Sequence, residues 1–204
     1  QGLSQNTATV DPIDLSSVVI DRGGRLDAEQ VSKLEVYKRY LHTDSGASDF
    51  APPGTPGGMG LVTGNEHDEF GLVSTDPINR NKMVAKRQGK MVSMKPELPI
   101  AINHGVETAD IGFIGVGMCY GVILEAIDLL AQKGIFAQYH QVRTLWPMLD
   151  DTPAFTKRCP NIFVVEYNAT AQLAKLIIAH GGEEENINNI LRYDGIPMQA
   201  QDLV

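Results

Sequence analysis

The chain has 204 residues and a formal net charge of -8 at pH 7, so its surface as a whole does not attract a polyanion and we expect no nucleic-acid partner. Its two cysteines, Cys119 and Cys159, exclude a disulfide framework or a four-cysteine cluster within this chain and suit a reducing, cytoplasmic setting. No apolar run is long enough to cross a bilayer, so no membrane contact is expected. Because the sequence begins with Gln1 and carries no leader pattern, we expect it to continue a longer polypeptide.

Residues 1–95 are rich in turn formers and charges, which predicts an extended linker arm with short helices. The segment DAEQVSKLEVYKRYL, at 27–41, places apolar residues on a common face and predicts a helix. Prolines and glycines in 42–60 predict a loop. A second helix is expected from Pro77, with Asp76 as its N-cap.

Residues 96–204 alternate short apolar runs with amphipathic segments, the pattern of a parallel sheet covered on both faces. The fold class is therefore α/β, a small parallel doubly wound domain preceded by the arm. We expect strands at 110–117, 135–142, 161–167 and 187–195, and helices at 119–134 and 169–180.

Three polar features fall at the carboxyl ends of these strands, where such folds bind ligands. They are GVGMCYG (115–121), the Trp146-Pro147 turn and EYNATAQL (166–173). Gly115 and Gly117 suit either an anion site at a helix N-terminus or a tight turn, and the glycine spacing does not complete GxGxxG. For Cys119 the alternatives are a reactive thiol and a packed apolar residue. For Glu166, Asn168 and Gln172 they are ligand contacts and helix capping.

An acidic stretch, LVTGNEHDEFG at 61–71, carries Glu66, His67, Asp68 and Glu69 in succession. The alternatives are a metal site, an acid/base centre and a network that fastens the arm to a partner surface. Adjacent residues in an extended loop point to opposite sides, which disfavours metal binding. The helix that follows presents a basic row that either pairs with this loop, docks a partner or is merely solvated: Arg80, Lys82, Lys86 and Lys90.

Seven segments occur together in an order that resembles the alpha subunit of 2-oxoacid:ferredoxin oxidoreductases, most closely the 2-oxoglutarate type. They are TDSGASDFAPPGTPGG, TGNEHDEFG, NRNKMVAKRQGKM, IGVGMCYG, TLWPM, VVEYNATAQLAKL and LRYDGIPM. The resemblance covers nearly the whole chain. It implies that 1–95 is a linker after an absent pyrimidine-binding domain and that 96–204 is a transketolase C-terminal-like domain.

The family resemblance also implies a reaction, cofactors and partners. The reaction is oxidative decarboxylation of a 2-oxoacid to an acyl-CoA with reduction of ferredoxin. Thiamin diphosphate with Mg²⁺ and an iron–sulfur cluster belong to the complex rather than to this chain, and coenzyme A is the co-substrate. A beta subunit and ferredoxin are the expected partners in a hetero-oligomer.

By the same resemblance no catalytic, cofactor-binding or metal residue is assigned to this chain. Glu66 to Glu69 are expected to be architectural or to lie at a subunit contact. The family commonly reads GISPR where this sequence has GASDF, so any anion-binding role of that arginine does not carry over to Phe50. A non-catalytic interaction module and a standalone nucleotide-binding protein are the alternative functions.

Overall fold

The computed structural model describes residues 9–204, which form two compact units, Val10–Glu97 and Leu98–Val204. We refer to Val10–Glu97 as the arm and to Leu98–Val204 as the sheet unit. The expected place of the two units in a larger protein stays a prediction. Within the described residues no helix combines the length and the apolar character needed to span a membrane.

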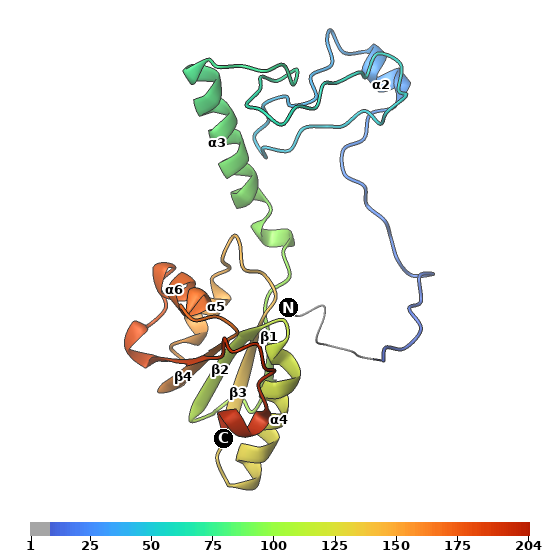
Figure 1. Cartoon of the computed structure of the whole chain (residues 1–204). Coiled ribbons are helices and arrows are strands. Elements are labelled where there is room, and N and C mark those ends of the chain that lie inside the picture. Colours follow the sequence, from blue (N-terminus) through green and yellow to red (C-terminus); the bar gives the residue numbers. More distant parts are fainter. Residues whose placement is uncertain (1–8) are drawn as a thin grey trace. The chain divides into compact units, whose positions relative to one another are not determined.

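The sheet unit is built on five strands in the order β1-β3-β2-β4-β5 (Figure 1). Strands β3, β2, β4 and β5 are parallel, and β1 pairs antiparallel with β3 at one edge. This confirms the predicted α/β class. The strands are β1 Ile102–Gly105, β2 Ile111–Val116, β3 Ala137–Val142, β4 Asn161–Glu166 and β5 Ile187–Leu191.

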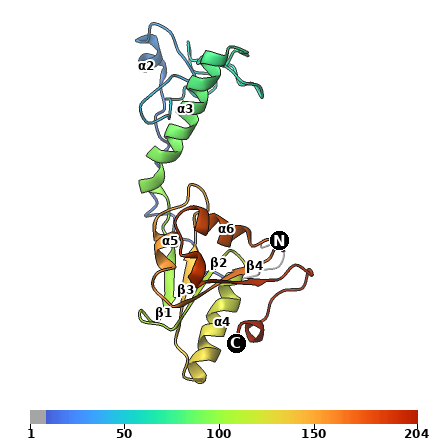
Figure 2. The same cartoon turned by 90° about the vertical axis from the view of Figure 1, so that its left-hand side faces the viewer.

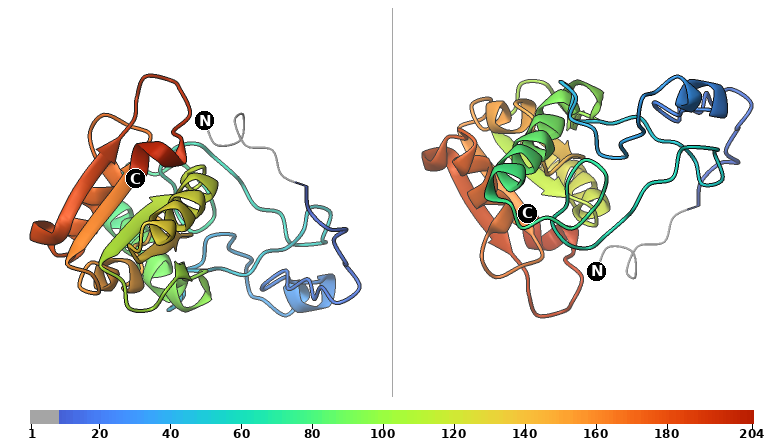
Figure 3. Two further views of the ribbon diagram at one scale, coloured as in Figure 1. Left: turned by 90° about the horizontal axis from the view of Figure 1, so that it is seen from below. Right: turned by 90° about the horizontal axis from the view of Figure 1, so that it is seen from above.

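The alternation of side chains along the strands produces two hydrophobic clusters, one on each face of the sheet. Phe113 packs with the cluster that includes helix α4 (Cys119–Gln132), and its neighbour Ile114 packs with the cluster that includes helix α6 (Gln172–Ala179). Helix α5 (Asp151–Phe155) lies on the same face as α6, whereas the C-terminal turn η3 (Ala200–Leu203) lies beside α4 (Figures 2 and 3).

Two elements of the sheet unit were not predicted, and one predicted helix was too long. Strand β1 and helix α5 had no expected counterpart, and α6 begins at Gln172 rather than at 169. Residues before α6 cannot continue it, because Ala171 has a left-handed backbone with φ of 50°. The other predicted strands and the helix at 119–134 are present within a few residues of their expected ends.

The strand order places a topological switch point between β2 and β4. The chain runs from β2 through α4 to β3 on one side, then crosses through α5 to β4 on the other side of β2. In open α/β sheets the crevice at such a point, beyond the carboxyl ends of the two strands, is the usual ligand site.

The arm contains two α-helices joined by long loops. Helix α2 spans Ala28–Ser32 and begins with a capping box formed by Asp27 and Gln30. The prediction of a helix through residue 41 is therefore wrong beyond Ser32, because the following residues bond to distant loops: the Tyr37 hydroxyl accepts from Ala51 N–H. Short 3-10 turns, η1 (Lys95–Glu97) in the arm and η2 (Glu184–Asn186) in the sheet unit, complete the elements.

Helix α3 spans Pro77–Ser93, as the sequence predicts. Asp76 is its N-cap and accepts from the backbone N–H groups of Ile78 and Asn79. Pro77 occupies the first helical position, where its missing N–H leaves no bond unmade.

Candidate functional site

The switch point between β2 and β4 contains a cavity of about 260 Å³. It is lined by the segment after β2, Val116 to Cys119, and by the segment at the end of β4, Val165 to Asn168. Two of the three polar features that the sequence places at this edge therefore meet. The third does not line this cavity: Trp146 is 61% exposed and packs its ring edge against His180.

Glycine is needed at the two positions of the β2–α4 turn for different reasons. A Cβ on Gly115 would lie 2.8 Å from Ile123 Cδ1 and 3.0 Å from Cys119 Cβ, so glycine permits the close approach of β2 to α4. Gly117 has φ of 60° and open space around it, so its role is backbone conformation. Both positions fit the tight-turn interpretation.

Cys119 is a buried thiol at the first position of α4. Its Sγ lies 3.3 Å from the Val165 carbonyl oxygen, to which it donates, and its residue is 2% exposed. Burial raises the pKa of the Cys119 thiol to about 11, more than the nearby backbone N–H lowers it. The thiol is therefore protonated at neutral pH, which matches a packed residue rather than a nucleophile.

Glu166 caps the N-terminus of α6. Its carboxylate accepts from the backbone N–H groups of Leu173, at 2.7 Å, and Ala174, at 3.1 Å, and from Asn168 Nδ2 at 2.6 Å. The Asn168 side-chain oxygen in turn accepts from Gln172 N–H at 3.3 Å. Glu166 is 4% exposed, so these bonds occupy a buried carboxylate whose oxygens would otherwise be available to a ligand.

The four ionisable residues of the acidic stretch point to different partners within the arm. Glu66 receives two bonds from Arg87, at 2.6 and 3.1 Å, and this contact lowers the pKa of Glu66 to about 2. Glu69 accepts from Lys38 Nζ and from His42 N–H, both at 2.9 Å, and its pKa is lowered chiefly by the Lys38 bond.

The other two residues of the stretch also make structural contacts. The His67 ring packs on the Tyr40 ring with centroids 4.1 Å apart, and its Nδ1 contacts the Asp68 carbonyl oxygen. The Asp68 carboxylate accepts from Phe70 N–H and Leu72 N–H, closing the loop on itself. In the part of the chain that is described, no three histidine, cysteine or carboxylate groups converge as a metal site. The described contacts of the stretch all lie within the arm, and a contact with a partner surface stays a prediction.

The basic row on α3 divides into two kinds of residue. Lys86 Nζ donates to the Tyr40 carbonyl oxygen at 2.8 Å and to Ser48 Oγ at 2.7 Å, so it holds two arm segments together. Burial, followed by the neighbouring cations Lys90 and Arg39, lowers the pKa of Lys86. Lys82, Lys90 and Arg80 are exposed.

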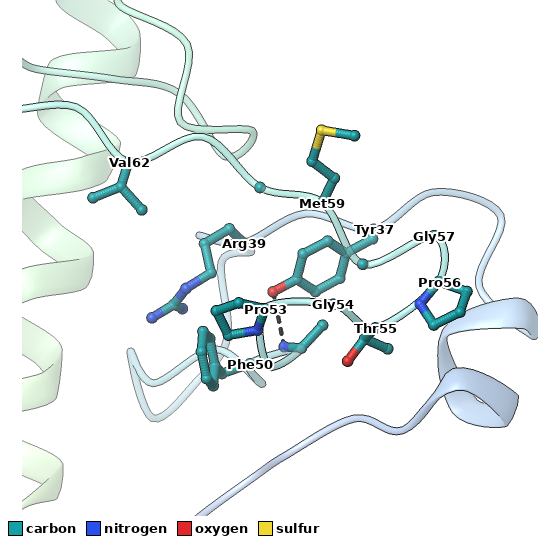
Figure 4. Close-up of a pocket in the computed structure, with 13 residues that line it drawn as sticks. Tyr37, Arg39, Phe50, Pro53, Gly54, Thr55, Pro56, Gly57, Met59 and Val62 are labelled. Atoms are coloured by element: carbon teal, nitrogen blue, oxygen red, sulfur yellow. Dashed lines mark hydrogen bonds between the residues drawn. The ribbon is translucent and has the colours of Figure 1, made fainter.

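A second and larger cavity, of about 520 Å³, lies within the arm (Figure 4). No sequence pattern predicts this cavity. The Arg39 guanidinium carbon stands 4.9 Å from the centroid of the Phe50 ring, and the Tyr37 hydroxyl closes the wall by its bond to Ala51 N–H. The remaining wall is a loop rich in proline and glycine, from Pro53 to Gly60, together with Val62.

The chain's own residues do not fit the metal cofactors that the family resemblance implies. An iron–sulfur cluster needs several thiolates, and the two cysteines are both buried in the sheet unit, where burial raises their pKa values. A magnesium diphosphate needs converging oxygen ligands, and among residues 9–204 no three histidine, cysteine or carboxylate side chains converge. We therefore derive no chemical step through either group from this chain.

The chain is similar in sequence to known proteins of one family. No family model matches the chain. The alpha subunit of 2-oxoacid:ferredoxin oxidoreductase 2 from Aeropyrum pernix is 31% identical over 192 residues, covering 92% of this chain and 29% of its own length. The corresponding alpha subunit from Saccharolobus solfataricus is 30% identical over 170 residues, covering 81% of this chain and 26% of its own length.

A solved structure supports the same family. The 2-oxoglutarate:ferredoxin oxidoreductase from Magnetococcus marinus, with 2-oxoglutarate, coenzyme A and succinyl-CoA bound, is 33% identical with a TM-score of 0.72. The match covers 82% of this chain and 29% of that chain. The chain belongs to the family of 2-oxoacid:ferredoxin oxidoreductase alpha subunits, as a partial-length relative that spans less than a third of their length. The resemblance expected from the sequence segments is thereby confirmed.

Proposed function

We propose that this chain is part of the alpha subunit of a thiamin-diphosphate-dependent 2-oxoacid:ferredoxin oxidoreductase whose substrate is 2-oxoglutarate. The complete enzyme converts the 2-oxoacid and coenzyme A to acyl-CoA and CO₂, and it passes two electrons to ferredoxin. Thiamin diphosphate with Mg²⁺ and the iron–sulfur cluster are held elsewhere in the cytoplasmic complex, in part by a beta subunit. This chain serves assembly and substrate access.

The observation that carries this proposal is the match in both sequence and structure to a 2-oxoglutarate enzyme. A role in assembly fits the exposed apolar side chains near the start of the arm, among them Ile13 at 77% and Val19 at 91%. Apolar groups exposed to this extent in one segment suit contact with another protein surface.

The test is anaerobic reduction of a viologen dye by the native complex, purified through an affinity tag on this chain. We expect reduction that requires coenzyme A and is faster with 2-oxoglutarate than with pyruvate. Omission of coenzyme A is the control. Faster turnover of pyruvate would keep the family and overturn the substrate. A purified assembly with neither thiamin diphosphate nor iron would overturn the enzyme assignment and favour an interaction module.

A further inference from the structure

We propose that the arm cavity is a binding site for the carboxylate of a small organic acid, with Arg39 as the residue that binds the charge. The choice of 2-oxoglutarate as ligand rests on the proposed function. The site itself rests on the geometry of the arm.

Arg39 is held in the cavity wall by contacts that leave its donors available. Its guanidinium carbon lies 4.9 Å from the Phe50 ring centroid and 5.2 Å from the Tyr40 ring centroid. Cation–π contact fixes the position of a guanidinium but consumes none of its five N–H donors. Figure 4 shows Arg39 in the cavity wall beside Phe50. Within the described residues Arg39 has no hydrogen bond and no ion pair.

A second cation, Lys86, lies near Arg39 in the arm. Lys86 Nζ lies 5.9 Å from the centroid of the Tyr40 ring, which Arg39 also contacts. The two cations are close enough that Arg39 contributes to the lowered pKa of Lys86. Glu69, which opposes the lowering of the Lys86 pKa, is itself paired with Lys38 at 2.9 Å. An anion that enters the cavity would therefore find the unpaired donors of Arg39.

The walls match an organic acid better than an inorganic anion. The cavity of about 520 Å³ is the size of a small-molecule site, and most of its lining is carbon: Phe50, Pro53, Pro56, Met59 and Val62. A carbon skeleton gains from that contact, whereas inorganic phosphate has no apolar surface to bury against these walls. The Tyr37 hydroxyl accepts from Ala51 N–H, so its own proton is available to a second ligand oxygen.

The experiment is a titration of the full chain with 2-oxoglutarate, followed by the Nε–Hε resonances of its arginines in NMR. We expect a saturable shift at Arg39 and no shift at Arg22, an exposed arginine of the same arm. Arg39→Met should weaken binding at least tenfold, since about 1.4 kcal/mol corresponds to a factor of ten and a charge-assisted bond contributes more. Arg39→Lys should recover part of the affinity, and Arg22→Met should leave it unchanged.

Ligand controls separate the carboxylate from its alternatives. Glutarate lacks the 2-oxo group and cannot be decarboxylated as a 2-oxoacid, so its binding reports the site whatever the outcome of the viologen assay. The neutral dimethyl ester of 2-oxoglutarate should not bind. Three outcomes would each overturn the proposal. The first is an Arg39→Met variant that binds 2-oxoglutarate as tightly as the parent chain, and the second is an ester that binds as tightly as 2-oxoglutarate. The third is a shift at Arg39 that inorganic phosphate causes at a lower concentration than glutarate. If Arg39→Met disturbs the arm spectrum, the direct shift at Arg39 and the lysine variant decide.

Discussion

The cap at the switch point makes a quantitative prediction for Glu166→Ala. The substitution removes an acceptor from the backbone N–H groups of Leu173 and Ala174, both at buried residues of the first turn of α6. An unsatisfied buried donor costs about 1–3 kcal/mol, and water entering the adjoining cavity relieves part of this. We expect a loss of about 2–4 kcal/mol in the stability of the sheet unit. Glu166→Gln keeps one acceptor oxygen and should lose about 1–2 kcal/mol.

Amide hydrogen exchange is the assay, because the chain has two units and a single unfolding curve would mix them. Protection at Leu173 and Ala174 should fall in the alanine variant. Glu185→Gln changes an exposed glutamate of the same unit and serves as the matched control, expected within about 0.5 kcal/mol of the parent. Unchanged protection at both amides in Glu166→Ala would refute the capping role.

Two further predictions concern the arm. Arg87→Gln should raise the pKa of Glu66 from about 2 towards 4.5, and NMR titration of the Glu66 carboxyl carbon measures this change. The pKa of Glu66 is lower in the folded than in the unfolded chain. The stabilisation from this pair is therefore present above about pH 4.5 and is lost as the pH falls towards 2. A midpoint that stays near 2 would contradict the pairing. If the exposed part of the basic row docks a partner, reversing Lys82 and Lys90 to Glu should weaken co-purification of the complex, less so at high salt. Unchanged assembly would leave these two lysines merely solvated, whereas Lys86→Glu should disturb the arm itself.

Strands β2 and β4 were predictable because each is largely buried and reads as a short apolar run. Strand β1 could not be found this way, since this edge strand has four residues, INHG, with a single large apolar side chain, and three of the four residues are exposed. Helix α5 is five residues long and contains Pro153, so it is too short to show a helical period. The end of α2 at Ser32 was missed for a different reason, because residues after it satisfy bonds to loops that are distant in sequence.

The switch-point cavity was predictable because it follows from strand topology alone. The arm cavity was not, because it depends on contacts such as Tyr37 with Ala51 and Arg39 with Phe50 that no local pattern encodes. A signal was nevertheless present in hindsight: an arginine flanked by aromatic residues precedes a loop dense in proline and glycine. The acidic stretch bonds within the arm, as with Glu66 to Arg87, so its predicted contact with a partner surface stays a prediction.

The arm holds its conformation mainly through polar contacts. Its buried apolar side chains are Val31, Ala51 and Met83, too few to offset the conformational entropy of a segment of this length. Water competes for the ion pairs and hydrogen bonds of the arm, so each of them adds only a small net stability to the folded arm. A ligand that binds Arg39 only in the ordered arm must therefore stabilise the arm by mass action. By the same linkage, a partner surface that orders the arm raises the affinity of the cavity, so acid binding and assembly are expected to favour each other.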